Sequence, residues 1–369
     1  MKAALFTGAG YAGPSVRGKW PVPVNVYSSQ AAQDSMNWAL EQFSMADDLG
    51  FDWVTVAEHH FSPFSLTPNP MVMAGALTQR IKRAKIALLG PNIPIQNPVR
   101  VAEEFAMLDN LTGGRVVAGM LRGTSNEYVT YNINPAESRE RFDEALQIIR
   151  RAWTEPQPFG WWGRHFEYRT VSIWPRPVQQ PHPPIYMSGS SPESAELAAR
   201  NRIGLGFAVT SVPLASQSAR LYRQVANATG WTPGADDIIY RVGIHVAQSD
   251  QQAFEDLHTG PDGNTGLTRA NPVIDDVVAQ AGYYGRDANQ QRGRVGRNRG
   301  AEYAERLENG QQLAGSPETV LEQICTVQRE LGAGVLDLIF RGADRDSTRR
   351  SIELFGEKVL PRVHELDLS

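Results

Sequence analysis

Short continuous apolar runs alternate along this chain with longer stretches in which apolar residues recur about every 3.6 positions. The run from Phe51 to Ala57 is typical of a strand that is buried on both faces. From Asp34 to Gly50 the apolar positions lie three or four residues apart, which predicts one buried face of a helix that Gly50 ends. No run of roughly 18 apolar residues occurs, so no membrane-spanning helix is expected.

Eight apolar runs are expected to be strands, each followed by at least one helix. The runs are residues 2–7, 53–57, 86–89, 115–120, 185–188, 203–209, 238–247 and 335–340. Eight such units in 369 residues match a (β/α)8 TIM barrel. A doubly wound parallel sheet is the alternative, but it normally has about six units and often a glycine-rich first turn. No G-x-G-x-x-G sequence follows the first run, which favours the barrel.

Three stretches lack this alternation and are expected to be loops. Residues 8–31 are rich in Gly and Pro, residues 155–184 contain seven prolines, and residues 259–312 are rich in Gly, Asn, Gln and Arg. The third stretch follows the seventh strand and is longer than ordinary connections in a compact barrel. We expect a mobile lid that excludes water, inserted within a single domain of residues 1–369. A solvated loop without a function explains the same composition.

Composition narrows the class of protein. The net charge of −4 argues against nucleic acid or a membrane surface as a main partner. The arginines of residues 259–312 have no aromatic stacking platform beside them, which also argues against nucleic acid. The single cysteine, Cys325, excludes an internal disulfide and a cysteine metal cluster, and it fits a cytoplasmic protein.

The most informative motif is Glu58-His59-His60, directly after the second predicted strand. Enzymes with this fold place their chemistry at the C-terminal ends of the strands. Adjacent residues of a strand point to opposite faces, and no other ligand motif is nearby, so a metal site is not expected. Histidine holds or moves a proton near neutral pH. The pattern favours an acid/base or ligand-binding role for one histidine, and a structural histidine is the alternative for each.

Two sequences are candidates for a phosphate site. Gly189-Ser190-Ser191-Pro192 follows the fifth predicted strand, and Gly315-Ser316-Pro317 comes after the seventh. Each serine is a good helix cap, and the free N–H groups at a helix start attract phosphate. A capped helix without a ligand explains both sequences equally well. Arg122, after the fourth strand, is either a phosphate ligand or a salt-bridged arginine of the rim.

The order and spacing of several motifs resemble those of the bacterial luciferase-like flavin monooxygenases. The resemblance covers nearly the whole chain, most clearly residues 50–210 and 313–340. The matching segments are Glu58-His59-His60-Phe61, residues 66–70, residues 97–104, Leu108-Asp109, Gly113-Gly114-Arg115, Leu121-Arg122-Gly123 and residues 188–199. The fold so implied is a TIM barrel, in agreement with the strand count.

The resemblance implies a two-component monooxygenase. Such an enzyme receives reduced FMN from a separate flavin reductase, and the reduced flavin reacts with O2 to give a C4a-peroxyflavin. This species then oxygenates a small organic substrate by hydroxylation or by Baeyer–Villiger-type insertion. The flavin supplies the difficult chemistry, so no metal is needed, while the protein positions the ring and excludes water. A homodimer is also expected.

The resemblance also assigns roles to individual residues. His59 matches the family's catalytic histidine, with His60 and Glu58 as neighbours that orient it. The expected cofactor contacts are Glu58, Asn92 along the isoalloxazine, the phosphate-contacting Arg122, and Gly189, Ser190 and Ser191 of the phosphate loop. This match favours the loop at Ser191 over the one at Ser316. The loop at residues 124–131 departs from luciferase, and Tyr128 is a candidate cofactor or substrate contact within it.

Two alternative functions stay open. The same fold supports hydride transfer with a deazaflavin, although the Glu-His-His motif and the Arg122 loop favour FMN. The other alternative is a flavin-binding relative without catalytic activity. The substrate is not specified, because its pocket would be built from loops that carry no motif.

Overall fold

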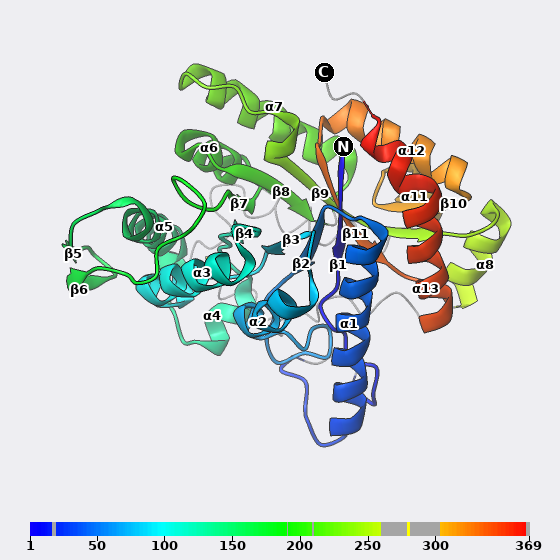
Figure 1. The fold of residues 1–369 in the computed structure, drawn as a ribbon, viewed down its shortest axis with the longest axis horizontal. Coiled ribbons are helices and arrows are strands. Elements are labelled where there is room, and N and C mark those ends of the chain that lie inside the picture. The colour runs from blue at the N-terminus through cyan, green and yellow to red at the C-terminus, as the bar shows by residue number, and fades with distance from the viewer. Residues whose placement is uncertain (17–19, 190, 209, 260–278, 281–302, 367–369) are drawn as a thin grey trace.

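The computed structural model describes residues 1–16, 20–189, 191–208, 210–259, 279–280 and 303–366. Its main sheet is a closed parallel barrel in which helices surround the strands (Figure 1). The barrel strands, in order around it, are β1 (Lys2–Phe6), β2 (Trp53–Val56), β3 (Lys85–Leu88), β4 (Val116–Gly119), β7 (Ile185–Ser188), β8 (Gly204–Ala208), β9 (Ile238–Val246) and β11 (Val335–Phe340). Pairing of β9 with both β8 and β11 closes the ring, so the predicted (β/α)8 barrel is confirmed and the doubly wound sheet is excluded.

The connections between strands are mainly helical. The helices are α1 (Ser29–Leu49), α2 (Pro70–Arg80), α3 (Pro98–Thr112), α4 (Ser125–Thr130), α5 (Ser138–Thr154), α6 (Pro192–Asn201), α7 (Val212–Ala228), α8 (Asp250–Thr259), α11 (Tyr303–Glu308), α12 (Pro317–Leu331), α13 (Arg345–Leu354) and α14 (Leu360–His364). Short 3-10 turns are η1 (Ile93–Ile95), η2 (Pro135–Glu137) and η3 (Ala235–Asp237), and η4 (Phe355–Val359) is a π-helical turn. Within the described ranges, no helix is both long and apolar enough to cross a membrane.

Local signals explain where the helices begin. Asn69 caps α2 and Asn97 caps α3, and in both cases a proline occupies the first helical position. The first helix starts earlier than predicted, at Ser29, because the side chain of Ser28 accepts a hydrogen bond from the backbone nitrogen of Ala31 at 3.3 Å. The predicted loop over residues 8–31 is therefore too long at its C-terminal end.

Three strands were missed by the sequence pattern. Residues 155–184, predicted as a loop, contain an antiparallel hairpin of β5 (Phe159–Trp162) and β6 (Glu167–Val171), seen beside α5 at the left of Figure 1. Trp161 holds this hairpin to α5 by donating a hydrogen bond to Glu144 at 2.9 Å. The third is β10 (Gln312–Gly315), which pairs with the C-terminal half of β9. Most of the predicted lid, residues 259–312, lies outside the described residues.

The barrel interior changes from apolar to polar towards the C-terminal ends of its strands. Trp53 and Tyr186 meet edge to face inside the barrel, with ring centroids 5.7 Å apart. Nearer the C-terminal ends of the strands, Arg241 of β9 donates a hydrogen bond from Nε to Asp337 of β11 at 2.5 Å. The guanidinium of Arg241 also lies 3.8 Å from the ring centroid of Phe6. The Trp53–Tyr186 pair therefore closes the base of the barrel and leaves the polar layer facing the opposite end.

Candidate functional site

The predicted site segments follow three strands that run in the same direction. Glu58 follows β2, Arg122 follows β4 and Ser191 follows β7. Because these strands are parallel members of one barrel, the three segments lie at the same end of it. The strands β4 and β7 are direct neighbours, so the loops that contain Arg122 and Ser191 are adjacent on the rim of the barrel.

The side chain of His59 faces a carboxylate from another strand connection. The Nδ1 atom of His59 lies 3.5 Å from Oε1 of Glu127, which is long for a hydrogen bond and suits an ion pair. Neither atom is accessible to solvent, although 17% of the His59 side chain remains exposed. Phe64 packs edge-on against the imidazole, with centroids 5.2 Å apart. The Nδ1 atom of His59 therefore faces Glu127 inside the protein and is not available to a ligand.

Glu127 reaches His59 because of the way α4 begins. Thr124 is the N-cap, and its backbone nitrogen donates to Oε2 of Glu127 at 2.6 Å, as in a capping box. The hydroxyl of Thr124 also donates to Oε2, which leaves Oε1 for His59. Burial acts to raise the pKa of Glu127, but its contacts with His59 and Thr124 outweigh burial and hold the pKa below its ordinary value.

The neighbouring His60 is buried and has its own carboxylate. Its Nε2 lies 3.2 Å from Oε1 of Glu58, and 6% of the residue is exposed. Its backbone carbonyl accepts a hydrogen bond from the indole of Trp20 at 3.1 Å. Tyr131 packs edge-on against the imidazole with centroids 5.2 Å apart. The two adjacent histidines therefore face different carboxylates, and His59 is the more accessible of the two.

Glu58 ties the end of β2 to the turn after β3. Its carboxylate accepts hydrogen bonds from the side-chain nitrogens of Asn92 at 3.0 Å and Gln96 at 2.8 Å. Asn92 is 2% exposed, so its amide nitrogen serves Glu58 in this structure. Contacts of Glu58 and Asn92 with a cofactor remain predictions.

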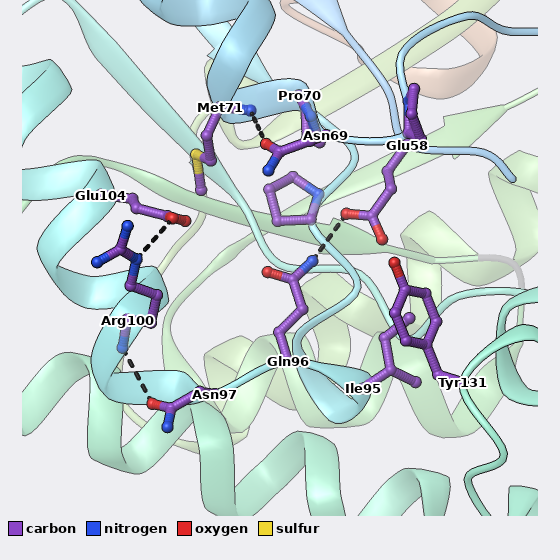
Figure 2. A pocket seen from close by; sticks show the side chains of 12 residues that line it. Glu58, Asn69, Pro70, Met71, Ile95, Gln96, Asn97, Arg100, Glu104 and Tyr131 are labelled. Atoms are coloured by element: carbon purple, nitrogen blue, oxygen red, sulfur yellow. Dashed lines mark hydrogen bonds and ion pairs between the residues drawn. The ribbon is translucent and has the colours of Figure 1, made fainter.

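A pocket of about 460 Å³ lies beside Glu58, between the starts of α2 and α3. Figure 2 shows the hydroxyl of Tyr131 directed towards the Glu58 carboxylate, with Gln96 bonded to the same carboxylate. Burial and then the charges of Glu58 and Glu127 raise the pKa of Tyr131, so its hydroxyl stays protonated at neutral pH. The Glu58–His60 pair thus has an accessible space on one side.

Arg122 lies in a loop that its neighbours hold in place. Its Nη1 donates to the hydroxyl of Ser138 at 3.1 Å. The hydroxyl of Tyr128 donates to the backbone carbonyl of Arg122 at 2.5 Å, and Tyr128 is 1% exposed. Tyr128 is thereby placed to support the loop, and a direct contact between Tyr128 and a ligand remains a prediction.

The structure distinguishes the two candidate phosphate loops. Ser191 caps α6 by accepting a hydrogen bond from the backbone nitrogen of Ser194 at 3.2 Å. Gly189 packs so closely on Leu205 that an added Cβ would lie 2.4 Å from its side chain, while Ser190 lies outside the described residues. At the rival loop, the backbone nitrogen of Ser316 donates to Asp250 at 2.7 Å. A carboxylate already occupies the start of α12, so the loop at Ser191 is the better phosphate candidate.

Sequence reasoning missed Glu127 and Gln96 as members of the site. The spacing Thr124-x-x-Glu127 is the signature of a capping box, so Glu127 was recognisable as a helix-start residue, though its contact with His59 was not. Gln96 carries no motif. In the described part of the chain, no group of three or more His, Cys, Asp or Glu residues is arranged to hold a metal.

Comparison with known proteins gives matches over most of the chain. A family model described as luciferase-like monooxygenase matches residues 20–334. The 4-hydroxyprotoasukamycin monooxygenase of Streptomyces nodosus subsp. asukaensis is 26% identical over 88% of this chain and 86% of its own. An uncharacterized protein of Sinorhizobium fredii, y4wF, is 36% identical, but the match spans 42% of this chain and 45% of that protein. The oxygenase component of a flavin-dependent trigonelline monooxygenase from Acinetobacter baylyi is 27% identical over 52% of this chain and 53% of its own.

Solved structures share the fold. The oxygenating constituent of 3,6-diketocamphane monooxygenase from Pseudomonas putida, in complex with FMN, has a TM-score of 0.76 at 20% identity and covers 98% of both chains. An F420-dependent secondary alcohol dehydrogenase has a TM-score of 0.67 at 19% identity, again over 98% of both chains. The fold thus occurs with both types of cofactor.

Proposed function

This chain belongs to the luciferase-like monooxygenase family, and we propose that it is the oxygenase component of a two-component system that uses reduced FMN and O2. Its substrate would be a small organic molecule, oxygenated by hydroxylation or by Baeyer–Villiger-type insertion. The names of two relatives support this reading, since one is an oxygenase component and one has FMN bound. The proposal includes a flavin reductase as partner, a homodimeric assembly and a cytoplasmic location.

The observation that carries the proposal is that an arginine, a helix start and an imidazole lie at the same end of the barrel. Arg122 contributes a guanidinium and Ser191 begins α6, whose first N–H groups suit an anion. These two donors follow the neighbouring strands β4 and β7, and His59 follows β2 at the same end of the barrel. This chemistry fits the phosphate of FMN, which Arg122, Gly189, Ser190 and Ser191 would hold.

When bound, reduced FMN supplies the electrons that activate O2. The chain's own contribution is to orient, to exclude water and to manage protons. His59 would hold or release a proton at its accessible ring nitrogen. Glu58 would keep Asn92 and the turn after β3 in place along the ring, and His60 would help to hold Glu58.

An anaerobic titration of the full-length apoprotein tests the proposal. We expect reduced FMN to bind at least about tenfold more tightly than reduced riboflavin, because a charge-assisted phosphate contact contributes more than about 1.4 kcal/mol. Arg122→Met should remove most of that difference. The control is Arg164→Met, since Arg164 is an exposed arginine in a surface ion pair with Glu140.

Two results would contradict the proposal. Equal binding of FMN and riboflavin would mean that the phosphate donor set is wrongly assigned. Tight binding of a reduced deazaflavin such as F420, without O2 consumption in air, would favour hydride transfer, a reaction that the F420-dependent neighbour makes relevant.

A further inference from the structure

We propose that Glu127 is the positioning residue of His59: it keeps the proton of the neutral imidazole on Nδ1, so that Nε2 takes and gives the reacting proton. The catalytic part of this inference rests on the proposed function. The protonation pattern itself concerns the apoprotein and is testable without any cofactor. Glu127 matches no motif of the resemblance, and its contact with His59 comes from the structure.

The geometry leaves a single partner for each of the two facing atoms. Oε2 of Glu127 already accepts two hydrogen bonds from Thr124. Oε1 is inaccessible to solvent, has no hydrogen bond within the standard distance, and faces Nδ1 of His59 at 3.5 Å. Nδ1 is inaccessible in the same way. A modest approach of the two side chains would complete the hydrogen bond.

The chemistry of the carboxylate then decides which nitrogen carries the proton. An ionised carboxylate is an acceptor, so the atom that faces Oε1 must carry a hydrogen. Glu127 is ionised at neutral pH because its contacts with His59 and Thr124 outweigh burial and lower its pKa. Nδ1 of His59 therefore holds a proton whether the ring is neutral or charged. The exposed part of the ring leaves Nε2 as the nitrogen that meets a ligand, as in catalytic triads.

His60 provides an internal reference for the tautomer of His59. His60, the next residue, presents Nε2 rather than Nδ1 to its own carboxylate, Oε1 of Glu58. Phe64 contributes an uncharged ring edge to His59. Tyr131 stays neutral and packs on His60. Two adjacent histidines should thus hold opposite tautomers, with Nδ1–H at His59 and Nε2–H at His60.

Histidine-selective 15N NMR of the full-length apoprotein measures both tautomers directly. The chain has seven histidines, and the ring signals of His59 are identified by their loss in His59→Gln. In the wild type, we expect the neutral ring of His59 to show a protonated Nδ1 and an unprotonated Nε2. His60 should show the reverse pattern in the same spectrum.

Glu127→Gln should invert the tautomer of His59 alone. The amide oxygen must take the place of Oε2 and accept from Thr124, so the amide nitrogen faces Nδ1 and donates to it. Nδ1 then becomes the acceptor and the proton moves to Nε2. Glu127→Asp keeps a carboxylate and should retain Nδ1–H. The matched control, Glu196→Gln, changes a carboxylate whose partner is Arg200 and should leave both histidines unchanged.

The outcomes are decisive even if Glu127→Gln folds poorly. A wild-type spectrum in which His59 carries its proton on Nε2 would overturn the inference without any variant. An unchanged tautomer in folded Glu127→Gln would do the same. A correct tautomer pattern combined with failure of the FMN titration would leave the positioning role intact and remove the proposed cofactor.

Discussion

Glu58 accepts hydrogen bonds from both the backbone nitrogen and the side-chain nitrogen of Asn92, at 3.3 and 3.0 Å. These bonds join the chain after β2 to the chain after β3, at the end of the barrel that carries the candidate site. The two segments approach closely enough that a Cβ on Gly90 would lie 2.4 Å from the backbone nitrogen of Glu58. Glu58 therefore has a structural task, whatever its contacts with a cofactor.

Glu58→Ala should lower the free energy of unfolding by about 2–3 kcal/mol, because it leaves the buried donor of Asn92 and the half-buried donor of Gln96 without an acceptor. Urea denaturation with two spectroscopic probes measures this loss. Glu196→Ala serves as the control, since it removes one partner of the exposed ion pair with Arg200 and should cost less than about 1 kcal/mol. Equal losses in the two variants would show that the Glu58 network contributes no more than a surface contact.

Gly123→Ala should weaken FMN binding as well as stability. Gly123 has φ +86° and an added Cβ would lie 3.2 Å from Oδ1 of Asn92. Gly50 has nearly the same backbone angle, φ +89°, but nothing within 4 Å of the added atom. Gly50→Ala therefore measures the cost of the backbone conformation alone, about 1 kcal/mol. We expect Gly123→Ala to cost more and to weaken FMN binding by displacing Arg122, as read from thermal unfolding and titration.

The barrel was predictable because its strands are buried on both faces. Trp53–Val56 and Val335–Phe340 read as apolar runs with one polar residue in each, Thr55 and Asp337, and helices separate the strands along the chain. The hairpin of β5 and β6 was not predictable in the same way. Its strands follow no clear alternation, lie partly exposed and are surrounded by prolines, which indicated a loop. The strand β10 is four residues long and borders the stretch of atypical composition.

The positions of candidate site residues directly after strands were predictable from the sequence. The contacts between residues on different strand connections were not. The Glu58-His59-His60 motif and Arg122 stand directly after apolar runs, so their place on the rim followed from the fold. The pairing of His59 with Glu127 joins residues on different connections, and no local pattern encodes such a contact. Likewise, nothing in the sequence near Ser316 showed that Asp250 would occupy the start of α12.

In Asp47→Asn, the free energy of unfolding should vary less with pH in the acidic range than it does in the wild type. The carboxylate of Asp47 accepts backbone hydrogen bonds from Lys82, Arg83 and Ala84 at 2.8, 2.9 and 2.7 Å. Burial acts to raise the pKa of Asp47, but these bonds outweigh it and lower the pKa. A lowered pKa means that the stabilisation is fully present above the ordinary value for aspartate and is lost as pH falls through the lowered one.

Urea unfolding of Asp47→Asn and wild type at several pH values tests this expectation. The wild type should be more stable by about 2 kcal/mol near pH 6. The difference should shrink below about pH 4, as the wild-type carboxyl takes up a proton. A difference in unfolding free energy that stays constant down to pH 3 would mean that the charge of Asp47 adds nothing to its hydrogen bonds with the backbone of residues 82–84.

The two histidines should respond differently to alanine, because His59 keeps part of its ring accessible while His60 is buried against Glu58. His59→Ala should retain FMN binding, yet lower substrate-coupled oxygenation by about 10²–10⁴-fold, the usual contribution of a general acid or base. His60→Ala should instead lower the unfolding free energy by about 2 kcal/mol or more, since it removes a partner of Glu58 and opens a cavity beside Tyr131. Product formation and O2 uptake with a generic flavin reductase, over a panel of small organic substrates, test the His59→Ala prediction. Urea unfolding tests the His60→Ala prediction.

Wild-type protein that binds FMN but oxygenates nothing would indicate a non-catalytic flavin-binding relative. Equal turnover in His59→Ala and wild type would show that the proton moves through another group, because the imidazole that Glu127 holds would then be dispensable.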